Sequence, residues 1–214
     1  MISLVESRGW SYELALLALT VIVLVVSGIG PYDRLTWWLE VAPVLVAIPL
    51  LWGTHHRFPL TRLLYTLIFI HALILMLGGH YTYARVPLGF WLQDLLELSR
   101  NHYDRLGHIA QGFIPAMAAR EILIRCTPLT QGKMLFFLVA CIALAISAFY
   151  EFIEWWAAVL LGGSAEEFLA LQGDIWDTQW DMFMALSGAI TAQVLLPRWH
   201  DRQLAQLPRS TRVQ

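Results

Sequence analysis

The sequence predicts an all-α membrane protein, a polytopic helical bundle of about six transmembrane helices with both termini in the cytoplasm. Two compositional observations favour this class: 58% of the 214 residues are hydrophobic and only 14% are charged. A soluble domain carries about 25% charged residues, so this chain has too little polar surface to cover itself in water. Several windows also approach the roughly 20 apolar residues that a spanning helix needs. The lipid bilayer is therefore a predicted partner, and a net charge of −2 argues against nucleic acid.

The first three predicted helices cover residues 14–30, 35–53 and 63–79. The first has no charged residue, and the third is interrupted only by His71. The second is weaker because it contains Glu40 and the prolines Pro43 and Pro49. Proline inside a helix removes a backbone hydrogen bond, although neighbouring groups can compensate for this in a membrane.

The last three predicted helices cover residues 106–123, 134–150 and 182–197. The last two have no charged residue, whereas the fourth helix of the bundle contains His108, Pro115 and Arg120 and carries the weakest signal. Residues 1–197 are thus predicted to form a single integral-membrane domain. Residues 198–214 are predicted to form a polar cytoplasmic tail.

The lysines and arginines set the predicted orientation, because short cytoplasmic loops hold an excess of them. One side of the six-helix topology holds Arg8, Arg57, Arg62, Arg120, Arg125, Lys133, Arg198, Arg202, Arg209 and Arg212. The other side holds Arg34, Arg85, Arg100 and Arg105. This excess places both termini in the cytoplasm, so the loop at residues 162–180, which has no basic residue, faces outward. Residues 90–98 predict an amphipathic helix in the outer interface.

Acidic and imidazole side chains gather at the outward-facing ends of the predicted helices. They are Glu40, His80, Asp104, His108, Glu151, Glu154, Asp174, Asp177 and Asp181. A charge inside the hydrocarbon costs at least about 2.5 kcal/mol, so such residues are functional hypotheses by default. Several stand three or four positions apart, a spacing that places them on one helical face.

Carboxylates and an imidazole on facing helices are typical of metal sites inside helical bundles. The predicted cofactor is a divalent metal, and its predicted ligands are Asp104, His108, Asp174, Asp177 and Asp181. Oxygen-rich sites with an imidazole suit Mg²⁺, Mn²⁺, Ca²⁺, Fe or Zn²⁺. The sequence pattern does not select among these metals.

Two further groups complete the predicted site. Glu151 and Glu154 are the candidate catalytic residues, because a carboxylate beside a metal-bound water can act as general base. The candidate substrate-binding residues are His80, His102, Arg100 and Arg105, of which the arginines suit an anionic head group. These residues predict an intramembrane enzyme that acts on a lipid or lipid-linked phosphate at the outer leaflet.

Three other interpretations of the same residues stay open. Aspartates at a helix start often cap the helix, which suits Asp174. Glu151 and Glu154 can instead pair with Arg100 or Arg105 in a structural ion network. The acids can also line the vestibule of a non-enzymatic transport or ligand-binding module.

Four segments carry a resemblance to a known family. They are GGHYTYARVPLG (78–89), NHYDRLGHIAQGF (101–113), YEFIEWW (150–156) and GDIWDTQWDM (173–182). They resemble the uncharacterised bacterial inner-membrane family typified by YjdF. The resemblance implies a multi-pass protein of the bacterial cell inner membrane, with no established activity to transfer. A looser similarity is to VanZ-like membrane proteins, in which an Asp and a His open one helix, a Glu closes the next and spaced Asp residues open a third.

Overall fold

The computed structural model describes residues 3–162, 166–169 and 172–207, and within them every regular element is a helix. The elements are α1 (Ser3–Ser27), α2 (Arg34–Thr54), α3 (Arg62–Tyr81), the short 3-10 helix η1 (Tyr83–Arg85), α4 (Pro87–Leu95), α5 (Tyr103–Cys126), α6 (Lys133–Leu161), α7 (Glu166–Leu169), α8 (Asp177–Leu195) and α9 (Pro197–Leu204). The predicted all-α class is confirmed. Parts of the predicted outer loop at 162–180 and of the predicted tail at 198–214 lie outside the described residues.

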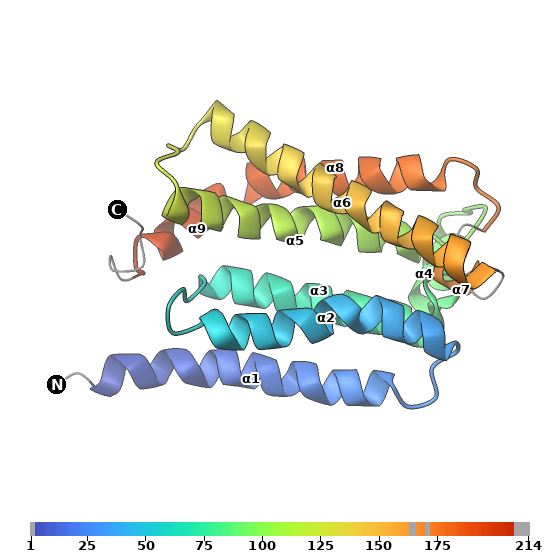
Figure 1. The fold of residues 1–214 in the computed structure, drawn as a ribbon, viewed down its shortest axis with the longest axis horizontal. Helices are drawn as coiled ribbons and strands as arrows, with labels where there is room; N and C mark the ends of the chain where they lie inside the picture. Colours follow the sequence, from blue (N-terminus) through green and yellow to red (C-terminus); the bar gives the residue numbers. More distant parts are fainter. Residues whose placement is uncertain (1–2, 163–165, 170–171, 208–214) are drawn as a thin grey trace.

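The long helices lie in two layers (Figure 1). α3 packs against α1 and α2 in one layer, and α5 packs against α6 and α8 in the other. Contact between α3 and α5 joins the two layers. The start of α1 and the short α9 lie at one end of the bundle, whereas α4 and α7 lie at the opposite end (Figure 1). Following the predicted orientation, we call these the inner end and the outer end.

Four of the six predicted apolar segments lie within a long helix, and those at 14–30 and 182–197 extend two or three residues beyond the ends of α1 and α8. Among the described residues, α2, α3 and α6 are long and apolar enough to cross a membrane, and α1 has a shorter apolar part at Ser11–Ser27. Large apolar side chains on the outside of the bundle, such as Val25 and Val46, are more than half exposed, as expected for a surface that faces lipid tails. That α1, α5 and α8 also span the bilayer stays a prediction.

Two helices begin at side-chain caps that the sequence supplies. The side chain of Asp33 accepts a hydrogen bond from the backbone N of Thr36 at 2.7 Å and starts α2. Thr61 Oγ1 accepts from the backbone N of Leu64 at 3.3 Å and starts α3. Each cap satisfies one of the backbone donors that the first turn of a helix leaves free.

Two helix boundaries at the outer end differ from the predicted ones. The last helix begins at Asp177, ahead of the predicted apolar segment at 182–197, and Asp174 lies before its first turn rather than at its cap. The reason is local: Asp174 Oδ1 accepts a hydrogen bond from the backbone N of Trp176 at 2.9 Å, and Gly173 has a φ of +83°, so this segment forms a turn. The interfacial helix predicted at 90–98 is α4, shifted towards Pro87, because proline is favoured in the first turn.

The closest helix contact lies between α5 and α8. A Cβ added at Gly112 would lie 1.7 Å from the carbonyl oxygen of Ala185, and one added at Gly188 would lie 2.2 Å from that of Ile109. Small residues allow such close approach in membrane bundles. The contact holds the first turns of the two helices, which carry several of the predicted site residues, side by side.

Candidate functional site

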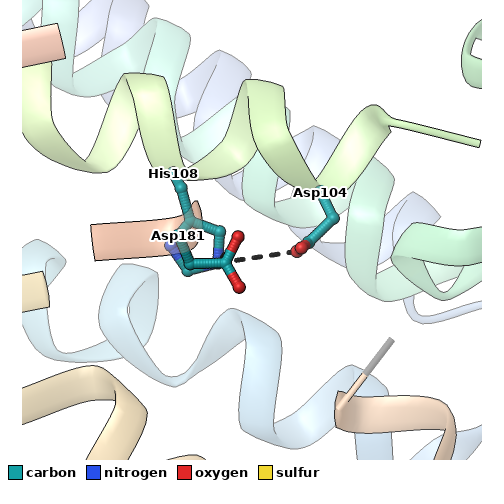
Figure 2. A group of neighbouring side chains, drawn as sticks. All are labelled: Asp104, His108 and Asp181. Carbon is teal, nitrogen blue, oxygen red and sulfur yellow. Dashed lines mark ion pairs between the residues drawn. The ribbon is translucent and has the colours of Figure 1, made fainter. Parts of the chain in front are cut away.

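A histidine and two aspartates meet at the outer end of the α5 and α8 contact (Figure 2). Asp104 and His108 lie one turn apart on α5, and Asp181 comes from α8. The His108 Nε2 atom is 3.6 Å from Asp104 Oδ1 and 3.7 Å from Asp181 Oδ1. His108 and Asp181 are buried, and Asp104 is partly buried. Three of the predicted metal ligands, from two helices, therefore converge.

Helix α6 adds two carboxylates to this histidine. It continues beyond the apolar segment at 134–150 to Leu161, so that Glu151 and Glu154 lie one turn apart on the helix, as their spacing predicted. Ligand atoms of His108, Glu151 and Glu154 all lie within 4.8 Å of one another. Glu151 is only 6% exposed, and its Oε1 has no hydrogen-bond partner among the described residues. Buried polar atoms are nearly always paired, so this oxygen is available to accept a hydrogen bond or bind a cation.

Gln111 fixes the orientation of the histidine ring. The Gln111 Oε1 atom lies 3.0 Å from His108 Nδ1. An amide oxygen can only accept, so Nδ1 is the donor, and Nε2 is the ring nitrogen that faces the two aspartates. Metal-binding histidines are commonly oriented by such a hydrogen bond on the other ring nitrogen. The nitrogen that faces Asp104 and Asp181 is therefore the one that can bind a cation.

The two arginines predicted to bind substrate are held by aspartates. Arg105 Nη2 lies 3.1 Å from Asp174 Oδ2 and 2.8 Å from Asp177 Oδ1, while its Nη1 donates to Asp181. Arg100 Nη2 lies 2.7 Å from Asp177 Oδ1. These ion pairs tie the start of α5 to the start of α8. Asp174 and Asp177 thus lie beside arginines rather than among the ligand atoms that surround the histidine.

The two remaining histidines that were predicted to bind substrate have different surroundings. His80 Nδ1 lies 2.8 Å from the carbonyl oxygen of Ser27, so it ties the end of α3 to the end of α1. His102 precedes α5, and its partial burial, together with the charges of Arg100 and Arg105, lowers its pKa. Its ring is therefore neutral at pH 7 and can accept a hydrogen bond at the outer end.

Glu40 is a polar residue of the outer end that the predicted site did not include. It is only 4% exposed, and Tyr150 donates a hydrogen bond to its Oε2 across 3.4 Å. Glu40, Tyr150, Asp104 and His108 line the same cavity, which has a volume of about 700 Å³. The sequence signal that could have added Glu40 to the site is an acidic residue inside a predicted spanning helix. Burying its charge in the hydrocarbon costs free energy, so such a residue is a functional hypothesis by default.

A second buried polar cluster lies at the inner end. Glu121, fully buried, accepts hydrogen bonds from His200 Nε2 at 2.9 Å, Arg125 Nη1 at 2.6 Å and Thr61 Oγ1 at 2.8 Å. Arg120 Nη1 donates to Nδ1 of His200 at 2.7 Å, which fixes the neutral tautomer of that ring. In the sequence, Arg120 and Arg125 indicated only which end of the bundle faces the cytoplasm. The signal that could have found the cluster is the spacing of four between Glu121 and Arg125 at the end of a predicted helix.

The donor set around His108 fits a divalent metal. Nitrogen and oxygen ligands at about 2.0 to 2.2 Å from one Zn²⁺ lie roughly 3.0 to 3.7 Å apart. The separations of 3.6 and 3.7 Å between His108 Nε2 and the two aspartates fall at the upper end of that range. One imidazole with several carboxylates suits Zn²⁺, Mn²⁺, Fe or Mg²⁺ better than a soft ion such as Cu(I).

Comparison with known proteins gives two matches. A family model described as "Predicted membrane protein (DUF2238)" matches residues 12–202. The chain is also 58% identical over 183 residues to the inner membrane protein YjdF of Escherichia coli (strain K12), which covers 86% of this chain and 88% of that protein. No solved structure matches. The predicted resemblance to the YjdF family and the inner-membrane location are confirmed, and the similarity to VanZ-like proteins stays a prediction.

Proposed function

We propose that this chain, which belongs to the DUF2238 family of predicted membrane proteins, is an intramembrane enzyme. It is a multi-pass inner-membrane protein. In this proposal a divalent metal binds at the outer end, held by Asp104, His108 and Asp181. The substrate is a lipid or a lipid-linked phosphate. The proposal rests on the cluster at His108 together with the cavity that extends from it.

The observation that carries the proposal is the position of His108 in two groups of potential ligands. Asp104 and Asp181 form one group with it, and Glu151 and Glu154 form the other. Buried carboxylates are costly unless they are paired with cations or bind a metal. The nearby arginines bind the aspartates, whereas Glu151 keeps a buried oxygen without a partner in the described part of the chain. A divalent cation would balance this excess of acids.

The chemistry follows from the proposed roles. A bound divalent metal polarises a phosphoryl oxygen and lowers the pKa of a bound water. In a hydrolysis, a water oxygen would bond to phosphorus as the bond between phosphorus and the lipid oxygen breaks. Glu151, whose Oε1 has no hydrogen-bond partner among the described residues, would accept the proton of that water, and the leaving oxygen would take up a proton from water at the outer end. Arg105 positions Asp181, to which it donates a hydrogen bond. The neutral ring of His102 can donate or accept a hydrogen bond at the outer end, beside the polar part of the substrate.

Elemental analysis of the purified, detergent-solubilised protein tests the metal. We expect near-stoichiometric metal in the wild type and its loss from a variant that combines Asp104→Asn with His108→Gln. The matched control is Asp174→Asn, which removes a carboxylate outside the proposed ligand set and should keep the metal. Circular dichroism and gel filtration establish that each variant keeps its helices and its size.

A stability measurement gives a second readout. A metal present at about 100 times its dissociation constant stabilises a folded protein by about 2.7 kcal/mol. Added Mg²⁺, Mn²⁺ or Zn²⁺ should therefore raise the unfolding midpoint of the wild type and of Asp174→Asn, but not that of the double variant. A wild type with no metal and no such stabilisation by any of the three ions would overturn the proposal.

A second function, proton or cation transfer across the membrane, is favoured by a specific observation. Glu13 Oε2 and His71 Nε2 are buried without hydrogen-bond partners in the described structure, and both residues line the cavity. Titratable groups therefore occur at several depths between the inner and the outer end, as in proton relays. Wild-type proteoliposomes with a trapped pH dye would report a proton flux that His71→Leu abolishes. Absence of flux in the wild type would exclude this function.

A further inference from the structure

The cavity between the two helix layers is elongated. Its lining on α2 begins at Glu40 and ends near Thr54, a stretch that rises about 21 Å at 1.5 Å per residue. Its volume of about 700 Å³ lies within the roughly 300 to 1,000 Å³ of typical small-molecule sites. The hydrocarbon core of a bilayer is about 30 Å thick, so a cavity of this length extends over much of it.

The lining of the cavity is mainly apolar along its length, apart from His71, Thr20 and Gln111, and carries charged or titratable groups at its ends. Both layers contribute small and branched apolar side chains, among them Val44, Ala47, Ile48, Ile114, Ala118 and Ile122. At the outer end the lining includes Asp104 and His108, whereas Glu13 and His55 lie towards the inner end. An apolar passage that ends in a polar site matches an amphiphile with a long chain rather than a compact polar solute.

Some of the residues that line the cavity also face outwards. Leu50 and Trp52 of α2 and Ile146 and Phe149 of α6 line the cavity and are between 41% and 60% exposed. Ile146 and Phe149 lie in the middle of α6, where exposed apolar side chains face lipid tails rather than water, whereas Leu50 and Trp52 lie near the inner end of α2. The rim of the cavity therefore faces the bilayer, from which an apolar chain can enter without crossing water.

We propose that the cavity binds a linear hydrocarbon chain of an amphiphile that enters from the bilayer, with the phosphate head of this molecule at Asp104 and His108. The position of the head group rests on the proposed function, whereas the position of the chain rests on the cavity alone. The polar groups at the inner end limit the depth that an apolar chain can reach. Affinity should therefore rise with chain length and then level off once the chain fills the cavity.

Photo-crosslinking tests where the chain binds. The protein in nanodiscs is incubated with a hexadecyl phosphate that carries a diazirine in the middle of its chain, irradiated and mapped by peptide mass spectrometry. We expect the label on the cavity walls of α2 and α5, and competition by unlabelled hexadecyl phosphate. Octyl, dodecyl and eicosyl phosphate give the length dependence, with octyl phosphate the weakest competitor and little gain from hexadecyl to eicosyl.

Filling the cavity provides the decisive variants. Ala47→Trp on α2 and Ala118→Trp on α5 each place a large ring in the cavity and should reduce labelling of its walls at least five-fold. The matched control is Ala145→Trp, at an exposed position of α6 outside the cavity lining, which should leave labelling unchanged. Labelling confined to the outer surface of the bundle and unaffected by Ala47→Trp and Ala118→Trp would overturn the proposal.

A further comparison separates this proposal from the metal. The Asp104→Asn, His108→Gln variant is labelled with the diazirine probe. In parallel, labelling is repeated in the presence of hexadecanol, a competitor that has the same chain without a phosphate. If the wild type and the variant both lack metal and their cavity walls are labelled equally, the proposed metal site is refuted and binding of the hydrocarbon chain in the cavity is supported. Metal binding without wall labelling would refute the chain site alone.

Discussion

The two buried polar clusters of this bundle contrast in how their acids are satisfied. From the cluster at His108 to the cluster at Glu121, α5 rises about 20 Å. At the inner end both oxygens of Glu121 accept hydrogen bonds, from His200, Arg125 and Thr61. At the outer end several carboxylates surround one imidazole, and an oxygen of buried Glu151 has no partner among the described residues.

This difference separates a structural network from a candidate binding site. A fully satisfied buried network rigidifies the structure around it. In the inner cluster both oxygens of Glu121 are satisfied, and the network joins α5 to α9 and to the cap of α3. Two nitrogens of Arg125, Nε and Nη2, have no hydrogen-bond partner among the described residues, and the guanidinium carbon lies 3.4 Å from the ring centre of Phe58. The partnerless oxygen of Glu151 is free to accept a further hydrogen bond or a cation, which distinguishes this acid from Glu121.

The largest expected difference in stability is between the two clusters when a buried Glu in each is replaced by Gln. Glu121→Gln removes the charge that compensates a buried arginine, and loss of one partner of a buried pair costs about 3 to 5 kcal/mol. Glu151→Gln removes a carboxylate with a partnerless oxygen and should leave stability unchanged or raise it. Urea or thermal unfolding in detergent, without added metal, measures both. Equal destabilisation by the two variants would break the contrast between the clusters.

A smaller effect is expected at the helix contact that supports the outer cluster. Gly112→Leu forces α5 away from α8 at a point where even a Cβ would lie 1.7 Å from a carbonyl oxygen, and overpacking costs about 1 to 3 kcal/mol. It should also lower metal content, since Asp181 moves away from His108. The matched control is Gly53→Leu, because a Cβ at Gly53 would meet nothing within 4 Å. If Gly112→Leu unfolded no more readily than Gly53→Leu, close approach would not govern this contact.

The smallest effects are expected at the rims of the two clusters. Asp201 pairs with Arg120 at 2.8 Å with its side chain 34% exposed, and Asp174 pairs with Arg105 with its side chain 26% exposed. Exposed ion pairs contribute at most about 1 kcal/mol. Asp201→Asn and Asp174→Asn should therefore each lower the unfolding free energy by less than about 1 kcal/mol, in the same denaturation assay. A loss at either rim as large as that of Glu121→Gln would show that the contrast does not depend on burial.

Sequence reasoning reached the outer site through helix periodicity and membrane topology. The spacing of Asp104 and His108 predicted one helical face, and the alternation of spans brought them to the same end as Glu151 and Asp181. It could not tell which aspartates pair with arginines, because that depends on distances between separate segments. The structure places Arg100 and Arg105 against Asp174 and Asp177.

The sequence by itself determined the class of this protein, its long helices and the end at which most of its acids lie. These properties depend on composition, hydropathy and the positions of basic residues, which are local and can be read along the chain. Only the tertiary structure decided the pairing of Glu121 with His200, the hydrogen bond from Tyr150 to Glu40 and the shape of the cavity. These depend on contacts between residues far apart in the sequence, which no local pattern along the chain specifies.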